Sequence, residues 1–568
     1  MIRKLAVVSK LAAVSLVSSL VLSGCSTSSS QPASTAPPPV VITPTTPQAA
    51  IKHVVVIFGE NISFDHYFGT YPNALNLPGE TKFTAATGTP TTTNNYVSNP
   101  GLLTNNPNLS VANVTGGVIV GSNPFRLAPA QALTADQDHG YTDEQKAFDG
   151  GKMDLFPVSV GTADSASQGT STGAPVAATT KALTMGYYDG NTATAMWNLA
   201  QHYALNDHSF DTNFGPSTQG ALNLVSGQIN GVVAANSLGL GSSAVDDGTG
   251  TGVQTLISDA DPFGDVCSST SKYAQMSGKN VGDLLNAAKI TWGWFQGGFD
   301  LTVTNTNGTT NCKRSSVSAI TGTQADYVQH HEPFQYYAST ANPTHARPTS
   351  VAAIGTTDAA NHQYDTHDFT DALAAGNMAA VSFLKAPSYQ NGHAGNSDPI
   401  DEGTFVATMV NAIEKSSFWS STVIILAYDD SDGWYDHVSN MVNGSASTAD
   451  AINGAGVCIS TTAAAAALAG VTGTKPAQGR CGYGPRLPLI VISPWAKKNF
   501  VDSTVTDQSS ILRFIEDTFV SSQRIGGGSF DTMAGPLTNM FDFGNGAAPP
   551  NPNVVQLNPT TGVVTSGN

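Results

Sequence analysis

The chain carries little charge of either sign, and most of that charge is acidic. Only 11% of its 568 residues are Asp, Glu, Lys or Arg, and the formal net charge is −17 at pH 7. A nucleic-acid-binding protein usually shows a basic stripe, and none is visible here. We therefore exclude nucleic acid as a partner. An acidic protein can still bind a phosphate ester where a metal or histidines neutralise the charge locally.

Cysteine is also scarce, and no closely spaced Cys/His cluster indicates a structural zinc site. One of the five cysteines, Cys25, ends the N-terminal segment, and four remain. Four cysteines in an exported protein fit two disulfides, although the sequence leaves three pairings open. We favour the local pairs, Cys267 with Cys312 and Cys458 with Cys481, because each would staple one loop-rich insertion.

The N-terminal apolar run, from Leu11 to Leu22, is shorter than the roughly 20 residues that a spanning helix needs. It follows a basic start and leads into Ser-Gly-Cys, a pattern that resembles a bacterial lipoprotein signal with the lipid on Cys25. A signal cleaved without lipidation and a short membrane anchor are the alternatives. We expect a signal peptide over 1–25, a Ser/Thr/Pro-rich tether over 26–50, and a protein of the bacterial cell envelope. It would be lipid-anchored, on the outer membrane or facing the periplasm, or else secreted.

The rest of the chain alternates apolar runs with helical patterns. Such alternation predicts an α/β fold in which a central, mostly parallel sheet is sandwiched by helices. We expect one catalytic domain over 51–544, long loop insertions at 75–123 and 231–279, and a disordered tail over 545–568. The expected strands are 53–59, 290–295, 380–384, 423–428 and 487–492, and the expected helices are 192–203, 405–413 and 509–519, the last capped by Asp507.

Oxygen-bearing side chains follow two of these strands. Glu60 and Asn61 come directly after the first, and Asp429 and Asp430 directly after the fourth. Ligands of parallel sheets bind at the carboxyl ends of the strands, so these four side chains could converge on one point. Such a group suits a hard divalent metal. The alternative is an ordinary pair of strand ends capped by polar loop residues.

Ser217 lies between a Gly-Pro turn and an expected helix over 221–226. The N-terminus of a helix suits an anionic group, so this serine is either a nucleophile or an N-cap, and N-caps are the commoner case. No Gly-x-Ser-x-Gly elbow surrounds it, which disfavours a Ser-His-Asp hydrolase. The x-Pro-x-Arg that formylglycine sulfatases need is missing as well. Metal coordination is the other way to activate a serine.

The segment Glu-Asn-Ile-Ser-Phe-Asp-His-Tyr-Phe-Gly at 60–69 resembles the signature of the bacterial phosphoesterase family, which contains acid phosphatases and non-zinc phospholipases C. The resemblance implies an alkaline-phosphatase-like α/β core with one metal site. It covers roughly 53–519. Further blocks appear in the family's order at 138–139 with 150–154, 185–188, 214–217, 226–227, 330–331, 389–393 and 428–437.

This resemblance implies a role for each candidate residue. Glu60, Asn61, Asp429 and Asp430 would bind one divalent ion, either Ca²⁺, Mg²⁺, Mn²⁺ or Zn²⁺. Ser217 would be the nucleophile, with its oxygen also on the metal. Histidines would hold the phosphoryl oxygens or protonate the leaving group. They are His139, His330, His331 and His393, each of which, taken singly, reads as an ordinary surface or locally bonded imidazole.

The chemistry would proceed through a phosphoserine at Ser217, which water then hydrolyses. None of the expected site residues is Arg or Lys, so histidine would have to supply the remaining positive charge. Imidazole is cationic mainly below its reference pKa of about 6.5. We therefore expect an acidic pH optimum.

Within the family, we expect an acid phosphatase acting on phosphate monoesters, with phospholipase C as the alternative. The nucleophile segment reads Gly-Pro-Ser-Thr-Gln-Gly at 215–220, whereas the phospholipase branch usually has Gly-Pro-Thr followed by Pro-Asn-Arg. The sequence stops soon after the expected catalytic core, so we expect it to be without the extra C-terminal β domains of the larger phospholipases, and its N-terminus reads Arg3-Lys4 in place of their twin arginine. A second alternative is a non-catalytic surface lipoprotein, but retention of every expected ligand and of all the histidines argues against it.

Overall fold

The computed structural model describes residues 46–162, 180–233, 243–246, 253–439, 471–472, 475–476, 483–544, 549–551 and 554–567. The expected signal peptide, Cys25, the tether up to residue 45 and the expected Cys458–Cys481 pair lie outside these residues. Within the described part of the chain, no helix combines the length and the apolar character needed to cross a membrane.

A nine-stranded sheet forms the centre of the domain, with the order β15-β12-β16-β1-β17-β20-β6-β21 and with β22 also paired to β6. The strands from β15 to β17 run parallel, whereas β20 is antiparallel to both of its neighbours. The expected α/β fold with a mostly parallel sheet is therefore confirmed. The bounds are β15 Gln363–Tyr364, β12 Trp292–Gln296, β16 Val381–Lys385, β1 His53–Gly59, β17 Thr422–Tyr428, β20 Arg486–Ile492, β6 Ala204–Phe210, β21 Phe500–Asp502 and β22 Thr506–Asp507.

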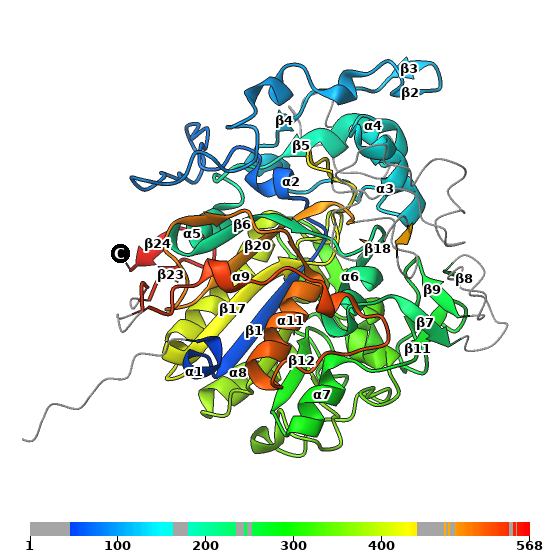
Figure 1. Cartoon of the computed structure of the whole chain (residues 1–568), viewed down its shortest axis with the longest axis vertical. Helices are drawn as coiled ribbons and strands as arrows, with labels where there is room; N and C mark the ends of the chain where they lie inside the picture. The colour runs from blue at the N-terminus through cyan, green and yellow to red at the C-terminus, as the bar shows by residue number, and fades with distance from the viewer. Residues whose placement is uncertain are drawn as a thin grey trace, which may run out of the picture. The chain divides into compact units, whose positions relative to one another are not determined.

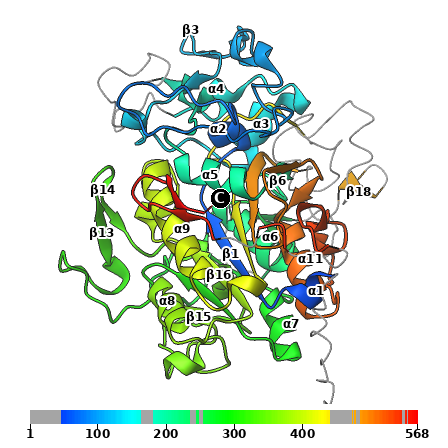
Figure 2. The ribbon, with the colours of Figure 1, turned by 90° about the vertical axis from the view of Figure 1, so that its left-hand side faces the viewer.

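Helices cover both faces of this sheet. In Figure 2, α8 and α9 lie on one side of β1 and β16, and α6, α7 and α11 lie on the other. Continuous apolar strands such as β1 and β17 are expected in a sheet that is buried on both faces. The bounds are α5 Thr194–His202, α6 Ser217–Ser226, α7 Val281–Ala288, α8 Thr366–Ala374, α9 Pro399–Glu414 and α11 Gln508–Phe519, with Asp507 capping α11 as expected.

A layer of short elements lies over one end of the sheet (Figure 1). We call this layer, residues 64–162 and 180–188, the cap. It contains the whole insertion expected at 75–123. Its loops are held by buried asparagines and by a second hydrophobic cluster that includes Phe148, Met153 and Phe156. Its elements are α2 Phe64–Phe68, β2 Val114–Thr115, β3 Val118–Ile119, β4 Phe125–Arg126, α3 Tyr141–Phe148, α4 Phe156–Ser159 and β5 Gly186–Tyr187.

The insertion expected at 231–279 contains a small sheet of its own, with the order β10-β11-β7-β9-β8. A second insertion folds into a hairpin, β13–β14. Cys267 and Cys312 form a disulfide, one of the two pairs expected. The bounds are β7 Asn230–Val233, β8 Ala244–Asp246, β9 Gln254–Leu256, β10 Asp261–Pro262, β11 Tyr273–Met276, β13 Ser315–Ser318, β14 Gly322–Ala325, β18 Val471–Thr472 and β19 Lys475–Pro476.

Two expectations about the ends of the domain need correction. The last tether residues form helix α1, Pro47–Ala50, which Thr46 caps and which buries Ala50. The segment expected to be disordered from residue 545 contains β23, Gln556–Leu557, and β24, Val564–Ser566. The side chain of Asn411 on α9 bonds to both backbone groups of Leu557, at 2.9 and 2.7 Å, which fixes this segment on the domain.

Candidate active site

The carboxyl ends of β1 and β17 bring the expected acidic residues together. These strands are neighbours with Gly59 opposite Tyr428, so the residues that follow them emerge side by side. The backbone N–H of Asn61 donates to Asp429 Oδ1 at 3.2 Å. Asn61 has a φ of +56°, a left-handed conformation that is uncommon for a residue other than glycine. Backbone strain of this kind clusters at functional sites.

Ser217 is the first residue of α6, and its side chain points at this acidic group. Its Oγ lies 3.1 Å from Glu60 Oε2 and 3.0 Å from Asp430 Oδ2, so the single hydroxyl proton can be donated to either carboxylate. The N-cap is Pro216, so the alternative of an N-capping serine is wrong. Close approach of α6 requires Gly220, since a Cβ there would overlap the backbone carbonyl of the residue that follows β17.

Lys385 is a member of the site that the sequence analysis missed. It ends β16, the strand on the other side of β1, and its fully buried Nζ contacts Glu60 Oε1 and, at 2.9 Å, Asp429 Oδ2. Burial lowers the pKa of Lys385, but the two carboxylates outweigh burial and raise it. The premise that the site holds no Lys or Arg is therefore wrong. This ammonium supplies positive charge whatever the state of the histidines.

The donor set fits a divalent cation. Glu60, Asp429 and Asp430 are buried with only one ammonium among them. Burial raises the pKa of Asp429 and of Asp430. Burial therefore favours the protonated form of each carboxyl, and a bound divalent cation would favour the ionised form. Asn61 Oδ1 is buried without a hydrogen-bond partner. Carboxylate, amide and hydroxyl oxygens without thiolate are the ligands of hard ions such as Ca²⁺, Mg²⁺ and Mn²⁺.

The rings of His139 and His393 meet edge to face, with ring centroids 5.9 Å apart. His139 Nδ1 lies 2.9 Å from the carbonyl oxygen of Gln137 and 3.3 Å from Asp432 Oδ1, which leaves Nε2 toward Asn61. Burial lowers the pKa of His139, but nearby Asp430 and Asp432 outweigh it and raise the pKa well above its usual value.

His330 and His331 lie in one 3-10 turn with their ring centroids 4.5 Å apart. Their surroundings shift the two pKa values in opposite directions. His331 Nδ1 is 3.0 Å from Glu60 Oε1, and burial together with the charge of His330 lowers its pKa. Burial also opposes the charged form of His330. Asp259 and Asp261, at 3.9 and 3.6 Å from its ring nitrogens, nevertheless raise its pKa. His330 is therefore the more readily cationic of the two.

Two further carboxyls position these groups, and both were missed in the sequence. Asp259 Oδ1 accepts from Thr218 N at 3.1 Å and Oγ1 at 2.7 Å, which joins the first turn of α6 to His330. Glu144 on α3 accepts from Gly215 N at 2.9 Å and Ser431 Oγ at 2.8 Å. Burial raises the pKa of Glu144 to about 8, so it holds these loops as a neutral carboxyl near neutral pH.

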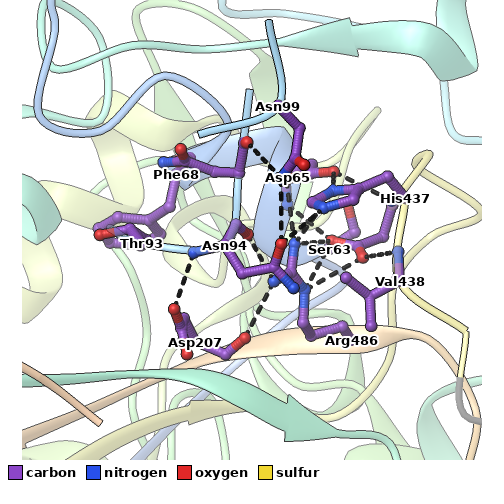
Figure 3. A network of polar contacts seen from close by, with 12 residues as sticks. Ser63, Asp65, Phe68, Thr93, Asn94, Asn99, Asp207, His437, Val438 and Arg486 are labelled. Atoms are coloured by element: carbon purple, nitrogen blue, oxygen red, sulfur yellow. Dashed lines mark hydrogen bonds and ion pairs between the residues drawn. The ribbon is translucent and has the colours of Figure 1, made fainter. Parts of the chain in front are cut away.

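Arg486 binds residues in the later part of both long motifs, 60–69 and 428–437, beyond the residues that form the site. Its guanidinium is fully buried and donates to Asp65 Oδ1 at 3.0 Å (Figure 3). It also donates to Asp436 Oδ2 at 3.0 Å. The His437 ring is 2.6 Å from Asp65 Oδ2. These two aspartates and His437 could group around a metal, but the guanidinium supplies the cation instead. The network ties the loop after β1 to the loop after β17.

The α/β fold and the site together define a phosphoryl-transfer type of centre, with a buried serine, an acidic group and histidines at the carboxyl ends of parallel strands. The model of the Phosphoesterase family matches residues 51–520, so the chain belongs to the Phosphoesterase family and is, in class, a phosphoric ester hydrolase. This membership confirms the resemblance that the motifs indicated.

Named relatives are phospholipases C. A non-hemolytic phospholipase C of Burkholderia pseudomallei is 25% identical over 516 residues, covering 87% of this chain and 59% of that protein. Phospholipase C B of Mycobacterium tuberculosis is 23% identical over 519 residues, covering 89% and 80%. A non-hemolytic phospholipase C of Pseudomonas aeruginosa is 29% identical over 197 residues, covering 34% and 28%. The matched part of the chain thus spans 59% of the Burkholderia enzyme and 28% of the Pseudomonas enzyme.

Among solved structures, a protein of the alkaline phosphatase superfamily from Vibrio parahaemolyticus matches with 11% identity and a TM-score of 0.27, covering 58% of this chain and 60% of that one. A likeness of this size does not establish a shared structure. The mostly parallel sheet and the family match stand without it.

Proposed function

We propose that this protein hydrolyses phosphodiesters of phospholipids in the manner of a phospholipase C, with Ser217 as the nucleophile and one divalent metal ion as its cofactor. The observation that carries the serine chemistry is the Ser217 hydroxyl, held 3.1 and 3.0 Å from two buried carboxylates at the N-terminus of α6. The positive end of the α6 dipole favours an anionic phosphoryl group.

The reaction needs two steps at phosphorus. As the Ser217 Oγ–P bond forms, the P–O bond to the departing alcohol breaks. The hydroxyl proton passes to the Asp430 oxygen that already accepts it, and a histidine, His139 by its placement, protonates the alcohol. Water then attacks phosphorus and the Oγ–P bond breaks. The histidine that gave up its proton takes one from the water, Asp430 returns a proton to Ser217 Oγ, and the phosphoryl headgroup leaves. The metal, which Glu60, Asn61, Asp429 and Asp430 would hold with Ser217, lowers the pKa of the serine and neutralises phosphoryl charge when it is bound.

The choice of a phospholipid diester rests on relatives that match nearly the whole chain. Two proteins named phospholipase C are similar over 87% and 89% of it. This reverses the preference for a phosphate monoesterase drawn from the nucleophile segment. A phosphatase stays the second candidate because residues 217–219 read Ser-Thr-Gln, which is not the phospholipase pattern described above. Its acidic optimum stays a prediction, but its premise is weaker, because the raised pKa values of His139 and His330 keep these imidazoles cationic to higher pH and Lys385 is cationic throughout.

Attachment to a membrane through a lipid on Cys25, in the bacterial cell envelope, belongs to the same proposal. It is supported by the N-terminal sequence pattern alone. A diacylglycerol-releasing enzyme held at a membrane would meet its substrate directly.

The test compares two chromogenic substrates. Wild-type protein and the Ser217→Ala variant are assayed across pH with p-nitrophenyl phosphorylcholine and p-nitrophenyl phosphate, with and without a chelator. We expect turnover of the diester, lost with the chelator and reduced at least about 10³-fold in the variant. Preference for the monoester would move the protein to the phosphatase branch. Turnover unchanged in a folded variant would exclude Ser217 as the nucleophile.

A further inference from the structure

The tip of the cap exposes more aliphatic side chain than a water-facing hairpin needs. Val111, Val118 and Ile119 are 78%, 65% and 62% exposed, and Leu109 and Val114 are 43% and 39% exposed. They lie on or next to the β2–β3 hairpin, at the side of the cap away from the large sheet (Figures 1 and 2). We call these five residues the apolar tip. Neighbouring exposed aliphatics of this kind mark an interaction surface.

The hairpin that carries the apolar tip is firmly rooted. Asn113 is fully buried at its base, where its Nδ2 donates to the Asp154 carbonyl oxygen at 2.7 Å and its Oδ1 accepts from Val158 N at 3.2 Å. The turn is Gly116-Gly117, with φ of +57° and +83°, as a two-residue hairpin turn of matching twist requires. The aliphatic side chains are therefore presented by an ordered support.

The segment that carries the apolar tip has no charged residue of its own. Between Lys82 and Arg126 the sequence has no Asp, Glu, Lys, Arg or His, although the whole chain has a net charge of −17. An acidic protein is repelled by an anionic lipid surface. A neutral, aliphatic tip can enter the interface of a zwitterionic bilayer without burying a charge.

The apolar tip also belongs to the end of the molecule that holds the site. Asn106, shortly before the hairpin, donates from Nδ2 to the Tyr435 hydroxyl at 3.1 Å, and Tyr435 lies in the motif at 428–437, which includes Asp429 and Asp430. Asp154, which anchors Asn113, follows the helix α3 that carries Glu144. A surface that docks on the apolar tip would therefore lie on the site's side of the sheet.

We infer that the apolar tip is a membrane-docking surface that inserts into the interface of a zwitterionic phospholipid bilayer. The inference rests on the proposed phospholipase function for its choice of a bilayer over a protein partner. It adds that the substrate is taken from an assembled lipid surface, and that the cap has its own affinity for this surface, independent of any lipid on Cys25.

The experiment places a reporter on the apolar tip of the full-length chain carrying Cys25→Ser, which prevents lipidation. All six native tryptophans, Trp197, Trp292, Trp294, Trp419, Trp434 and Trp495, are buried. A tryptophan introduced by Ile119→Trp is then the one tryptophan that brominated acyl chains of phosphatidylcholine vesicles can reach. Val317→Trp is the matched control, because Val317 is 63% exposed on the β13–β14 hairpin. We expect quenching and a blue shift for Ile119→Trp and neither for Val317→Trp.

A loss-of-function pair completes the test. Val118→Ser combined with Ile119→Ser should weaken phosphatidylcholine vesicle binding about tenfold. It should lower turnover of vesicle phospholipid while leaving turnover of soluble p-nitrophenyl phosphorylcholine unchanged. The corresponding change Val317→Ser should alter neither.

Three outcomes separate this inference from the proposed function. Quenching at the apolar tip, with no phosphodiester turnover by the unsubstituted protein, supports the docking surface and removes the proposed function. The docking surface is overturned, and the function kept, by a second outcome. In it, Val118→Ser combined with Ile119→Ser changes turnover of neither vesicle phospholipid nor p-nitrophenyl phosphorylcholine, and Ile119→Trp is not quenched. A blue shift that follows protein concentration rather than lipid assigns the apolar tip to a second copy of the chain and also overturns it.

Discussion

Replacing Arg486 should destabilise the protein strongly and at a defined place. The guanidinium is fully buried and donates to Asp436 from two of its nitrogens, at distances from 3.0 to 3.2 Å. It also bonds to Asp65 and to two backbone carbonyl oxygens, at 2.7 and 2.9 Å. Arg486→Met would fill much of the volume but leave these acceptors without a cation.

The size of the effect follows from which carboxylate is left unpaired. Asp65 keeps the His437 ring at 2.6 Å, whereas Asp436 loses its one ion-pair partner in the described part of the chain. Removing one partner of a buried ion pair costs about 3–5 kcal/mol. Burial already raises the pKa of Asp436 against the opposing charge of Arg486. In the variant that pKa rises further, so the stability loss should be smaller at pH 5 than at pH 7.

The assay is urea unfolding of wild type and variant at both pH values. Lys146→Met is the control, because Lys146 and its partner Asp143 are 48% and 34% exposed and such a pair contributes at most about 1 kcal/mol. Adding Asp436→Asn to Arg486→Met should recover part of the loss, since no unpaired charge then remains. A loss below about 1 kcal/mol, or no recovery in the double variant, would refute the account of the network.

Three other predictions concern single side chains. Asp259→Asn should move the alkaline limb of the kcat/KM profile to lower pH, because Asp259 opposes burial and raises the pKa of His330; an unmoved limb would contradict this. Burial raises the pKa of Glu414 from 4.5 to about 7, so its contribution to stability, about 3 kcal/mol, should be lost as pH rises across that window. The fall in stability over this range should therefore be smaller by about this amount in Glu414→Gln than in wild type, and an equal fall in both would contradict the assignment. Gly220→Ala should lower the free energy of unfolding in urea by about 1–3 kcal/mol and should lower turnover. The reason is that the added Cβ would overlap the backbone of Asp429, next to two of the site's carboxylates. An unchanged free energy of unfolding would contradict the close approach of α6.

The central strands could be predicted from the sequence because burial on both faces leaves a continuous apolar run, as in β1 and β17. β6 could not be found this way. It reads Ala-Leu-Asn-Asp-His-Ser-Phe, and its buried polar residues have partners from distant segments, such as Asp502 and Thr504 with Asn206. Its burial is a property of the tertiary structure and leaves no apolar pattern in the sequence.

The acidic half of the site was predictable for a related reason. Parallel strands deliver their following residues to one edge, so Glu60 and Asp429 converge once both strands are recognised. The same reasoning could have found Lys385, which ends the third strand at this edge, but a lone lysine after an apolar run reads as a solvent-exposed strand end. Asp259 lies in a segment rich in Gly, Ser and Thr, and its role depends on contacts with Thr218 and His330 that the sequence does not encode locally.

The most direct test of the central claim is to trap the covalent enzyme. The protein would be mixed with a short-chain phosphatidylcholine, quenched in acid within one turnover, digested, and examined by mass spectrometry of the peptide that contains Ser217. We predict a phosphorylcholine adduct on Ser217 that disappears on longer incubation and is absent from Ser217→Ala. A turning-over enzyme with no adduct on this peptide at any time, or with the adduct on another residue, would contradict the assignment of Ser217 as the nucleophile.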